Sequence, residues 1–268
     1  MHPIEHLRYI ARVTGADPVL VAREAAHALA EIYRDEPASL VPACRRLIER
    51  QVSSGPVWWV SARLLAAADP SEEARQSVRQ LDQDLTSYHL ADLIPDEATV
   101  LIVGWPDVSV EALRSRGDLE VLVVESSGEG SSLVRRLVER GSDAQLVADP
   151  GVGPAAGVAD LVLVEAHAAG PGGLLAASGS LAASAVAASR HIPVWGVTGV
   201  ARVLPAGLWG AVLSRLDESG EEPWERSVEL VPADLLTQVV STLGATEVGP
   251  GLAASTCPDA AELFRPAG

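Results

Sequence analysis

Glu165 and His167 are the residues whose types and spacing come nearest to an acid–base pair in this sequence. They follow a run of apolar residues at 161–164, and residues two apart on an extended segment project to the same side. A carboxylate and an imidazole on one wall of a pocket can transfer protons as a general acid and a general base. Two polar residues at the end of a strand have the same spacing, and spacing alone favours that structural interpretation.

Ser178, Gly179 and Ser180 form a second candidate site, because they open a predicted helix over 181–190. Backbone N–H groups at a helix N-terminus, together with serine hydroxyls, can bind a phosphate group. Capping of the helix by Ser180 accounts for the same residues equally well. The segment follows a predicted strand, where open α/β sheets bind ligands, so a phosphate site and simple capping both stay open.

Ser126, Ser127 and Trp105 are three further candidate ligand-binding residues, each placed just after a predicted strand. The two serines can donate hydrogen bonds to an oxyanion, although capping of the next helix by Ser131 or Ser132 is favoured. Trp105 is expected either at the mouth of a ligand crevice or filling it. The sequence lacks the Gly-x-Ser-x-Gly pattern of serine hydrolases.

The segment 151–157 carries three glycines in the spacing Gly-x-Gly-x-x-x-Gly, which invites comparison with a dinucleotide-binding loop. It contains Pro154, however, and follows the third predicted strand instead of the first. No acidic residue stands where the ribose would need one. A turn that leads into a short helix is therefore favoured, and a nucleotide-binding oxidoreductase is the weakest hypothesis for the chain.

Composition excludes several classes of chemistry and of partner. Among the 268 residues, 36 are acidic and 20 are basic, every basic one is arginine, and the net charge is −16. Without lysine there is neither a Schiff-base lysine nor the lysine of a phosphate-binding loop. An acidic chain also disfavours nucleic acid and anionic membranes as partners, because phosphate-dominated affinity needs clustered cations.

Cys44 and Cys257 are the only cysteines and lie far apart in the sequence. A reduced pair is favoured over a disulfide, and two cysteines without nearby partners do not make a zinc site. The first ten residues include His2, Glu5 and Arg8, so we expect no signal peptide, and no apolar run is long enough to span a bilayer. We therefore expect a cytoplasmic protein without a metal or a cofactor.

Helical spacing dominates the first third of the chain. Apolar residues recur on one face over 19–33, and Asp17-Pro18 supplies an N-cap followed by proline at the first helical position. Further helices are predicted over 39–51 and 57–68. A long helix is predicted to start at Asp69-Pro70 and to continue to about Leu93.

Short apolar runs alternate with helical or glycine-rich stretches in the rest of the chain. Five runs are predicted to be strands, at 99–103, 120–124, 144–148, 161–164 and 193–197, with crossover helices over 131–140 and 181–190. Near-continuous apolar strands between helices indicate a parallel sheet covered on both faces. We therefore predict an α/β fold with a helical N-terminal domain over 1–95 and a Rossmann-like, mostly parallel sheet domain over 96–268.

Several segments, taken in order, resemble the eIF2B-like family, which comprises eIF2B regulatory subunits, methylthioribose-1-phosphate isomerase and ribose-1,5-bisphosphate isomerase. Residues 159–168 (ADLVLVEAHA) are similar to its D-L-V-L-V-G-A-D-A, residues 123–126 (VVES) to its V-x-E-S-R-P, and residues 229–237 (ELVPADLLT) to its V-P-x-x-L-I-T. The resemblance extends over about residues 20 to 245. It implies a helical front, a Rossmann-like domain and a homodimer formed through that domain.

The same resemblance implies that the isomerase site has been replaced. The family's catalytic cysteine corresponds to Gly104, its catalytic aspartate to His167, and the glycine of its G-A-D motif to Glu165. Its substrate-binding Asn-Lys pair corresponds to Ala176-Ala177, and the arginine of its E-S-R-P motif to Ser127. The missing arginine and lysine are the cations that would neutralise a phosphate group.

Two hypotheses of function follow. In the favoured one, the chain is an eIF2B-like protein without isomerase activity that acts as a small-molecule-binding or protein-interaction subunit of a homo-oligomer. In the second, it is an aldose–ketose isomerase-like enzyme that acts on a sugar phosphate or a related small molecule through a rebuilt site. Its acid and base would be His167 and Glu165, and its phosphorylated ligand would be bound by Trp105, Ser126, Ser127, Ser178, Gly179 and Ser180.

Overall fold

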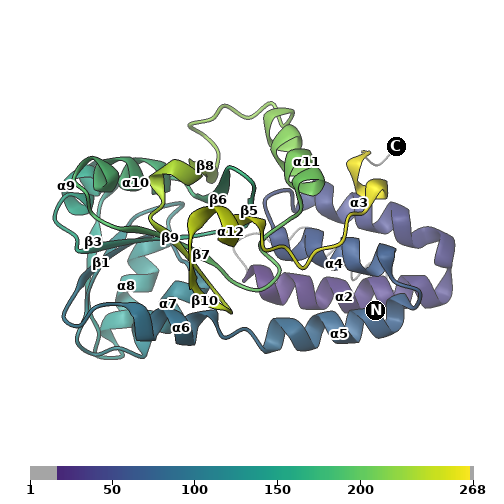
Figure 1. The fold of residues 1–268 in the computed structure, drawn as a ribbon, viewed down its shortest axis with the longest axis horizontal. Coiled ribbons are helices and arrows are strands. Elements are labelled where there is room, and N and C mark those ends of the chain that lie inside the picture. The colour runs from purple at the N-terminus through teal and green to yellow at the C-terminus, as the bar shows by residue number, and fades with distance from the viewer. Residues whose placement is uncertain (1–16, 266–268) are drawn as a thin grey trace.

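The computed structural model describes residues 17–265 of the chain, which form a bundle of helices followed by a sheet with helices on both faces (Figure 1). The predicted α/β class, with a helical front and a mostly parallel sheet, is confirmed. The division into domains at residue 95 stays a prediction. No helix among the described residues is long and apolar enough to cross a membrane.

The helical region consists of four helices that begin as the sequence predicts. They are α2 (Pro18–Asp35), α3 (Leu40–Arg50), α4 (Gly55–Ala66) and α5 (Pro70–Asp82). The predicted N-caps are present, because the carboxylate of Asp17 accepts a hydrogen bond from the N–H of Val19 at 2.7 Å and that of Asp69 accepts one from the N–H of Ser71 at 2.9 Å. Proline follows each cap at the first helical position, where its missing N–H costs nothing.

The long helix predicted from Pro70 to Leu93 is wrong, because it is two helices, α5 and α6 (Thr86–Leu93). Asp84 separates them. Its Oδ1 accepts from both the N–H and the hydroxyl of Thr86, at 2.9 and 2.5 Å, and its Oδ2 accepts from the N–H of Val200 at 2.8 Å. Local bonding of this kind competes with helix continuation and turns the chain toward the sheet.

The main sheet has seven strands in the order β10-β9-β7-β4-β1-β2-β3. Six are parallel to one another and β10 pairs antiparallel with β9. Their bounds are β1 (Thr99–Val103), β2 (Glu120–Val124), β3 (Asp143–Val147), β4 (Leu161–Glu165), β7 (Val194–Thr198), β9 (Gln238–Ser241) and β10 (Gly244–Thr246). The order reverses between β1 and β4, and this is the position where open α/β sheets bind ligands.

Helices cover both faces of the main sheet (Figure 1). They are α6, α7 (Asp107–Arg114), α8 (Gly130–Val138), α9 (Val152–Ala156), α10 (Ser180–Ser189) and α12 (Val248–Ala253), whereas α11 (Ala206–Asp217) packs against the helical region. The glycine-rich segment 151–157 forms the end of a short 3-10 turn and the five-residue α9, so the favoured reading of it as a turn into a short helix is confirmed.

The segment after β4 forms a hairpin that was not among the predicted strands. β5 (Ala168–Gly170) and β6 (Gly173–Ala177) pair antiparallel, and β6 pairs on its other side with β8 (Val228–Pro232). Pro171 and Gly172 form the turn, and the φ of +95° at Gly172 is one that glycine adopts without strain. The corner signal Gly-Pro-Gly-Gly is present in the sequence, but alanine-rich strands carry little β-propensity and were not predicted.

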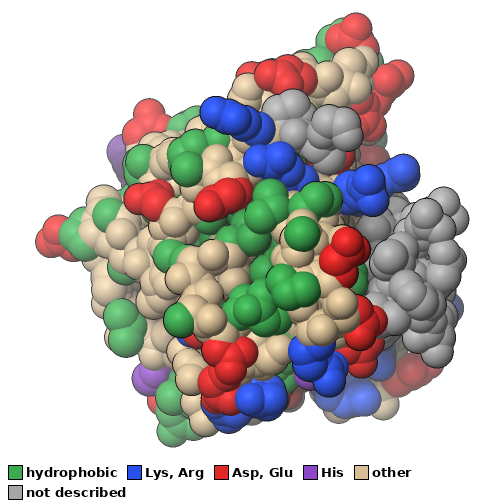
Figure 2. Space-filling view, turned by 90° about the vertical axis from the view of Figure 1, so that its right-hand side faces the viewer, with side chains coloured by type: hydrophobic (Ala, Val, Ile, Leu, Met, Phe, Trp, Pro, Cys, Tyr) green, Lys and Arg blue, Asp and Glu red, His purple; other side chains and the backbone are tan. Residues whose placement is uncertain are grey.

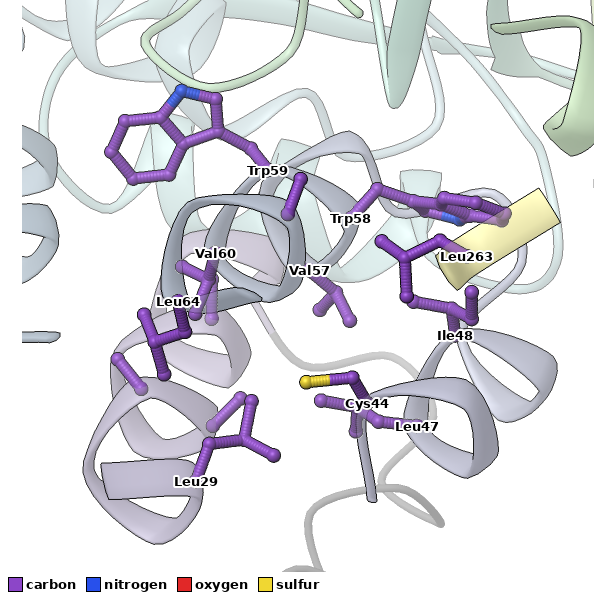
Figure 3. Close-up of a cluster of buried hydrophobic side chains, with 14 of the residues drawn as sticks. Leu29, Cys44, Leu47, Ile48, Val57, Trp58, Trp59, Val60, Leu64 and Leu263 are labelled. Atoms are coloured by element: carbon purple, nitrogen blue, oxygen red, sulfur yellow. The ribbon is translucent and has the colours of Figure 1, made fainter. Parts of the chain in front are cut away.

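The core of the helical region includes side chains from the end of the chain (Figure 3). Trp58 and Trp59 are fully buried, and Leu263 packs beside Ile48 and Trp58. Trp59 Nε1 donates to the hydroxyl of Thr256 at 3.1 Å. Cys44 and Cys257 belong to this core and are free thiols, so a disulfide is excluded.

Candidate functional site

Three helices begin at the carboxyl edge of the parallel strands, and a glutamate carboxylate occupies the N-terminus of each. At α7 this is Glu165, which accepts from the backbone N–H groups of Val108 and Ser109 at 3.2 and 2.8 Å and from the Ser109 hydroxyl at 2.9 Å. The N-terminus of a helix carries unpaired N–H groups and a partial positive charge, so it is a natural anion site. In this chain that anion is part of the protein.

Glu125 and Glu229 fill the other two N-termini in the same way. Glu125 Oε1 accepts from the N–H groups of Ser126 and Gly130, both at 3.0 Å, at the start of α8. Glu229 Oε1 accepts from the N–H groups of Gly179 and Leu181 at 2.7 and 2.8 Å, at the start of α10. The favoured capping by Ser131 or Ser132 is therefore wrong, and Ser180 does not cap α10 either, because the carboxylates supply the caps.

Glu165 is also one half of a buried ion pair at the strand-order switch between β1 and β4. Its Oε1 lies 2.9 Å from Nη1 of Arg202, and the two side chains are 5% and 3% exposed. Arg202 donates through the same nitrogen to the carbonyl of Ala166 at 2.6 Å. A buried charged pair thus lies at the strand-order switch, and Glu165 acts as a positioning group for α7 and Arg202.

His167 is not hydrogen-bonded to Glu165, so the predicted acid–base pair does not form. Its imidazole makes no hydrogen bond within residues 17–265, while its backbone bonds to Leu175 and Gly55. Burial, with a smaller effect from the Arg202 charge, lowers the pKa of His167 to about 4. The imidazole is therefore neutral near pH 7 and lacks the oriented carboxylate that a general base of this kind needs.

Asp107 is a titratable group of this region that the sequence did not single out. Burial and the charge of Glu165 raise its pKa to about 7. The sequence feature that points to Asp107 is its place at the first position of the helix after β1, two residues after Trp105. Desolvation beside a second carboxylate disfavours the charged form of Asp107, and this accounts for the rise of its pKa.

A cavity of about 330 Å³ brings together four of the predicted ligand-binding residues. Ser126 and Ser127 enter it from the end of β2, and Ser178 and Gly179 from the start of α10. The sequence missed the other side of this cavity, which a loop before β8 supplies through residues 224–227. Ser180, by contrast, is 2% exposed and does not line it.

Trp105 lies apart from these serines, so one predicted ligand residue is not brought together with the others. It lines a separate cavity of about 170 Å³ between α7 and α8, and the guanidinium of Arg136 lies 5.5 Å from its ring centre. The neighbouring Gly104 has a φ of +66°, which strains any residue with a side chain. The backbone at position 104 is therefore suited to glycine.

Metal chemistry gains no support from the side chains. Among residues 17–265 there is no group of three His, Cys, Asp or Glu side chains arranged to hold an ion. The carboxylate of Glu165 is already bound by Arg202, by the Ser109 hydroxyl and by backbone N–H groups. The expectation of a site without metal or cofactor stays a prediction.

Comparison with solved structures identifies the fold. The chain is similar to the translation initiation factor eIF-2B of Pyrococcus horikoshii OT3, with a TM-score of 0.76 and 16% identity over 91% of this chain and 96% of that one. It is also similar to a chain of the tetrameric eIF2B-beta2-delta2 complex from C. thermophilum, with a TM-score of 0.70 and 17% identity over 93% and 92% of the two chains. No family model and no curated protein matches the sequence. The resemblance to eIF2B subunits is thus confirmed as a shared fold.

Proposed function

We propose that this chain is an eIF2B-like subunit without isomerase activity, which functions by assembling with other protein chains, its own copies included. The observation that carries the proposal is the set of three glutamates, Glu125, Glu165 and Glu229, on the N-termini of α8, α7 and α10 at the carboxyl edge. An isomerase of sugar phosphates needs anion sites at this edge. Here each of those sites already holds a carboxylate.

The chemistry of the remaining groups supports the same proposal. Gly104 and His167 stand where the resemblance places the catalytic cysteine and aspartate, and the imidazole of His167 is neutral and unpaired among the described residues. A sugar phosphate at this edge would be repelled by the carboxylates, and the chain has no lysine that could neutralise its phosphate charge. Proton transfer between two carbon atoms of a sugar has no paired acid and base here.

Assembly is supported by the surface and by the relatives of the fold. Figure 2 looks onto the free end of the helical region and shows hydrophobic side chains in the middle of this face, with arginine and acidic side chains around them. Exposed apolar areas with a polar surround are typical of protein interfaces. One of the similar structures is described as a tetrameric complex of eIF2B subunits.

Incubation with phosphorylated sugars tests the enzymatic part of the proposal. Purified protein is mixed with ribose 1,5-bisphosphate or methylthioribose 1-phosphate, and the phosphorus NMR spectrum is followed over hours. We expect no conversion of either compound above the rate in buffer. Conversion that is lost in His167→Ala would overturn the proposal and support the isomerase hypothesis instead.

Light scattering tests the assembly. With a chain mass of 27.9 kDa, a homo-oligomer scatters with at least twice that mass at micromolar concentration. A mass of a single chain at all concentrations, with no partner chain co-purifying from the source cells, would contradict assembly.

A further inference from the structure

The 330 Å³ cavity is a built feature of the fold, since three segments far apart in the sequence enclose it. The end of β2 contributes Ser126 and Ser127, the start of α10 contributes Ser178, and the loop before β8 contributes Trp224 and Arg226. The Ser126 hydroxyl donates to the carbonyl of Ser178 at 2.9 Å and so joins the first two segments. Cavities of this size accommodate small organic ligands.

The charge of the lining disfavours a phosphorylated ligand. Three carboxylates line the cavity, from Glu125, Asp149 and Glu225. The one cation in the lining, Arg226, is engaged, because its Nη1 lies 3.7 Å from a carboxylate oxygen of Asp217 and its Nε donates to the carbonyl of Glu221 at 3.1 Å. A dianionic group would therefore enter a region of net negative charge, where like charges repel at these distances.

The same lining is well suited to hydroxyl groups. The carboxylates of Asp149 and Glu225 and the hydroxyl of Ser127 make no hydrogen bond within residues 17–265, so their lone pairs are available to donors. Ser127 also has a φ of +53°, a left-handed conformation that costs free energy in a residue with a side chain. Strain of this kind is concentrated at ligand sites, where it fixes the direction of a binding group.

Trp224 provides an apolar surface at the rim of this polar cavity. It is 77% exposed, whereas Trp58 and Trp59 are fully buried and Trp209 is 4% exposed. A tryptophan left in solvent gains nothing from core packing, and its broad face packs well against a flat ring. An aromatic face beside free carboxylates and a serine hydroxyl is the chemistry that holds a ring compound by stacking and by its hydroxyl groups.

We propose that this cavity binds an uncharged ring compound with neighbouring hydroxyl groups, that is, a nucleoside or an unphosphorylated sugar. The ring stacks on Trp224, and the hydroxyl groups donate to Asp149, Glu225 and Ser127. The inference rests on the proposed function, because it names the ligand class of a subunit that does not turn over sugar phosphates.

Ligand-observed NMR tests this inference with four probes: adenosine, ribose, adenosine monophosphate and ribose 5-phosphate. We expect at least one of the two uncharged probes to bind at millimolar concentration, and its phosphorylated counterpart to bind at least about tenfold more weakly. Comparison of adenosine with ribose distinguishes stacking of a base from stacking of a sugar ring. Asp149→Asn removes one negative charge from the cavity, so it is expected to reduce the difference in affinity between the uncharged and the phosphorylated probes.

Two variants locate the binding. Trp224→Ala is expected to weaken binding of the uncharged probe at least about tenfold, whereas Tyr88→Ala, which removes another exposed aromatic side chain distant from the cavity, leaves it unchanged. The inference is overturned if neither uncharged probe binds, if Trp224→Ala binds as the wild type does, or if the phosphorylated probes bind more tightly. In each case the proposed function stands unless a phosphorylated compound is also converted to product.

Discussion

Glu165 shows how one carboxylate can be a structural group in a place where the fold leads one to expect a catalytic one. It holds the start of α7 through Val108 and Ser109 and it neutralises Arg202. Nε and Nη2 of Arg202 are buried without a hydrogen-bond partner in the described part of the chain. The guanidinium therefore depends on Glu165 for most of its compensation, since a buried charge without a partner is strongly destabilising.

Replacement of Glu165 by glutamine is expected to lower the free energy of unfolding by about 3–5 kcal/mol, because it leaves Arg202 as an uncompensated buried charge. Glu111→Gln is the matched control, because the Glu111–Arg114 pair is exposed to solvent, and its effect is expected to stay below about 1 kcal/mol. Urea unfolding measures both variants. An unchanged stability of Glu165→Gln would contradict the structural role of this residue.

Asp107 and His167 make stability depend on pH in opposite directions. The pKa of Asp107 is raised from 3.8 to about 7 by burial and by Glu165, so between these values the folded state keeps a proton that the unfolded state has lost, and stability falls as pH rises. The pKa of His167 is lowered from 6.5 to about 4, so between those values the unfolded state holds the extra proton, and stability rises with pH. The two contributions oppose each other from about pH 4 to 6.5.

Asp107→Asn is expected to remove only the first of these contributions. The free energy of unfolding of the variant, minus that of wild type, should increase from pH 5 to pH 8 by an amount on the order of 1–2 kcal/mol. The reason is that only the wild type loses stability as Asp107 gives up its proton. Denaturant unfolding of both proteins at the two pH values measures this gain. If the two proteins differ in free energy of unfolding by the same amount at pH 5 and at pH 8, Asp107 is ionised in both the folded and the unfolded state over this range.

At the scale of elements, α4 is fixed to the sheet through its first residue. The N–H of Gly55 donates to the carbonyl of His167 at 2.8 Å, and a Cβ added to Gly55 would lie 2.9 Å from that carbonyl oxygen and 3.0 Å from the carbonyl oxygen of Arg202. The backbone of the helical region thus touches the backbone after β4 with no room for a side chain. This contact couples the helical region to the segment that carries Glu165 and His167.

Gly55→Ala is expected to destabilise the protein by about 1–3 kcal/mol, since neither backbone carbonyl can move without shifting a strand. Gly210→Ala, in the interior of α11 with no atom near the added Cβ, is the control and is expected to stabilise by about 0.5–1 kcal/mol. Thermal and urea unfolding measure the two variants in parallel. Equal effects of the two substitutions would show that the close contact at Gly55 is absent in solution.

The capping of α10 by Glu229 leads to a prediction about anions. Glu229→Ala should lose about 1 kcal/mol of stability in chloride buffer and regain part of it in phosphate, because the emptied N-terminus can then bind the ion. Glu222→Ala, a change at an exposed glutamate in the preceding loop, controls for the general effect of phosphate on stability. If both variants respond equally to phosphate, the α10 terminus is not an anion site.

The sequence predicts the strands and helices at the carboxyl edge of the main sheet. It does not predict which polar groups at this edge form hydrogen bonds with one another. The apolar runs and the caps at Asp17 and Asp69 have local causes, so their positions are predictable. Glu229 reaches α10 across 50 residues of sequence, and Glu165 reaches Ser109 across 56. Such pairings depend on the order of strands in the sheet, and a glutamate that caps a distant helix has no local pattern by which to find it.

At the scale of the whole molecule, the two cysteines lie in the same hydrophobic core although they are far apart in the sequence. Cys44 comes from α3 and Cys257 from the segment after α12, and both belong to the hydrophobic cluster of the helical region. Burial raises the pKa of each thiol to about 12. Neither is reactive as a thiolate while the core is intact.

Labelling of the two thiols by a disulfide reagent at pH 8 is expected to be slow and to proceed at one common rate, set by the unfolding of the whole protein. In concentrated guanidinium both thiols should react at once, which gives the reference rate. Mass spectrometry assigns the label to each cysteine. Rapid labelling of Cys257 alone would show that the last segment detaches while the helical region stays folded.

The contact between the last segment and the helical region also has a consequence for biosynthesis. Arg45 donates to the carbonyl of Glu262 at 2.7 Å and Trp59 to Thr256, so the first helices meet their final neighbours only when residues 256–263 are available. A ribosome makes these residues after the strands of the main sheet. During translation the core of the helical region is therefore incomplete until these residues have been made, because Cys257, Ala260 and Leu263 belong to it.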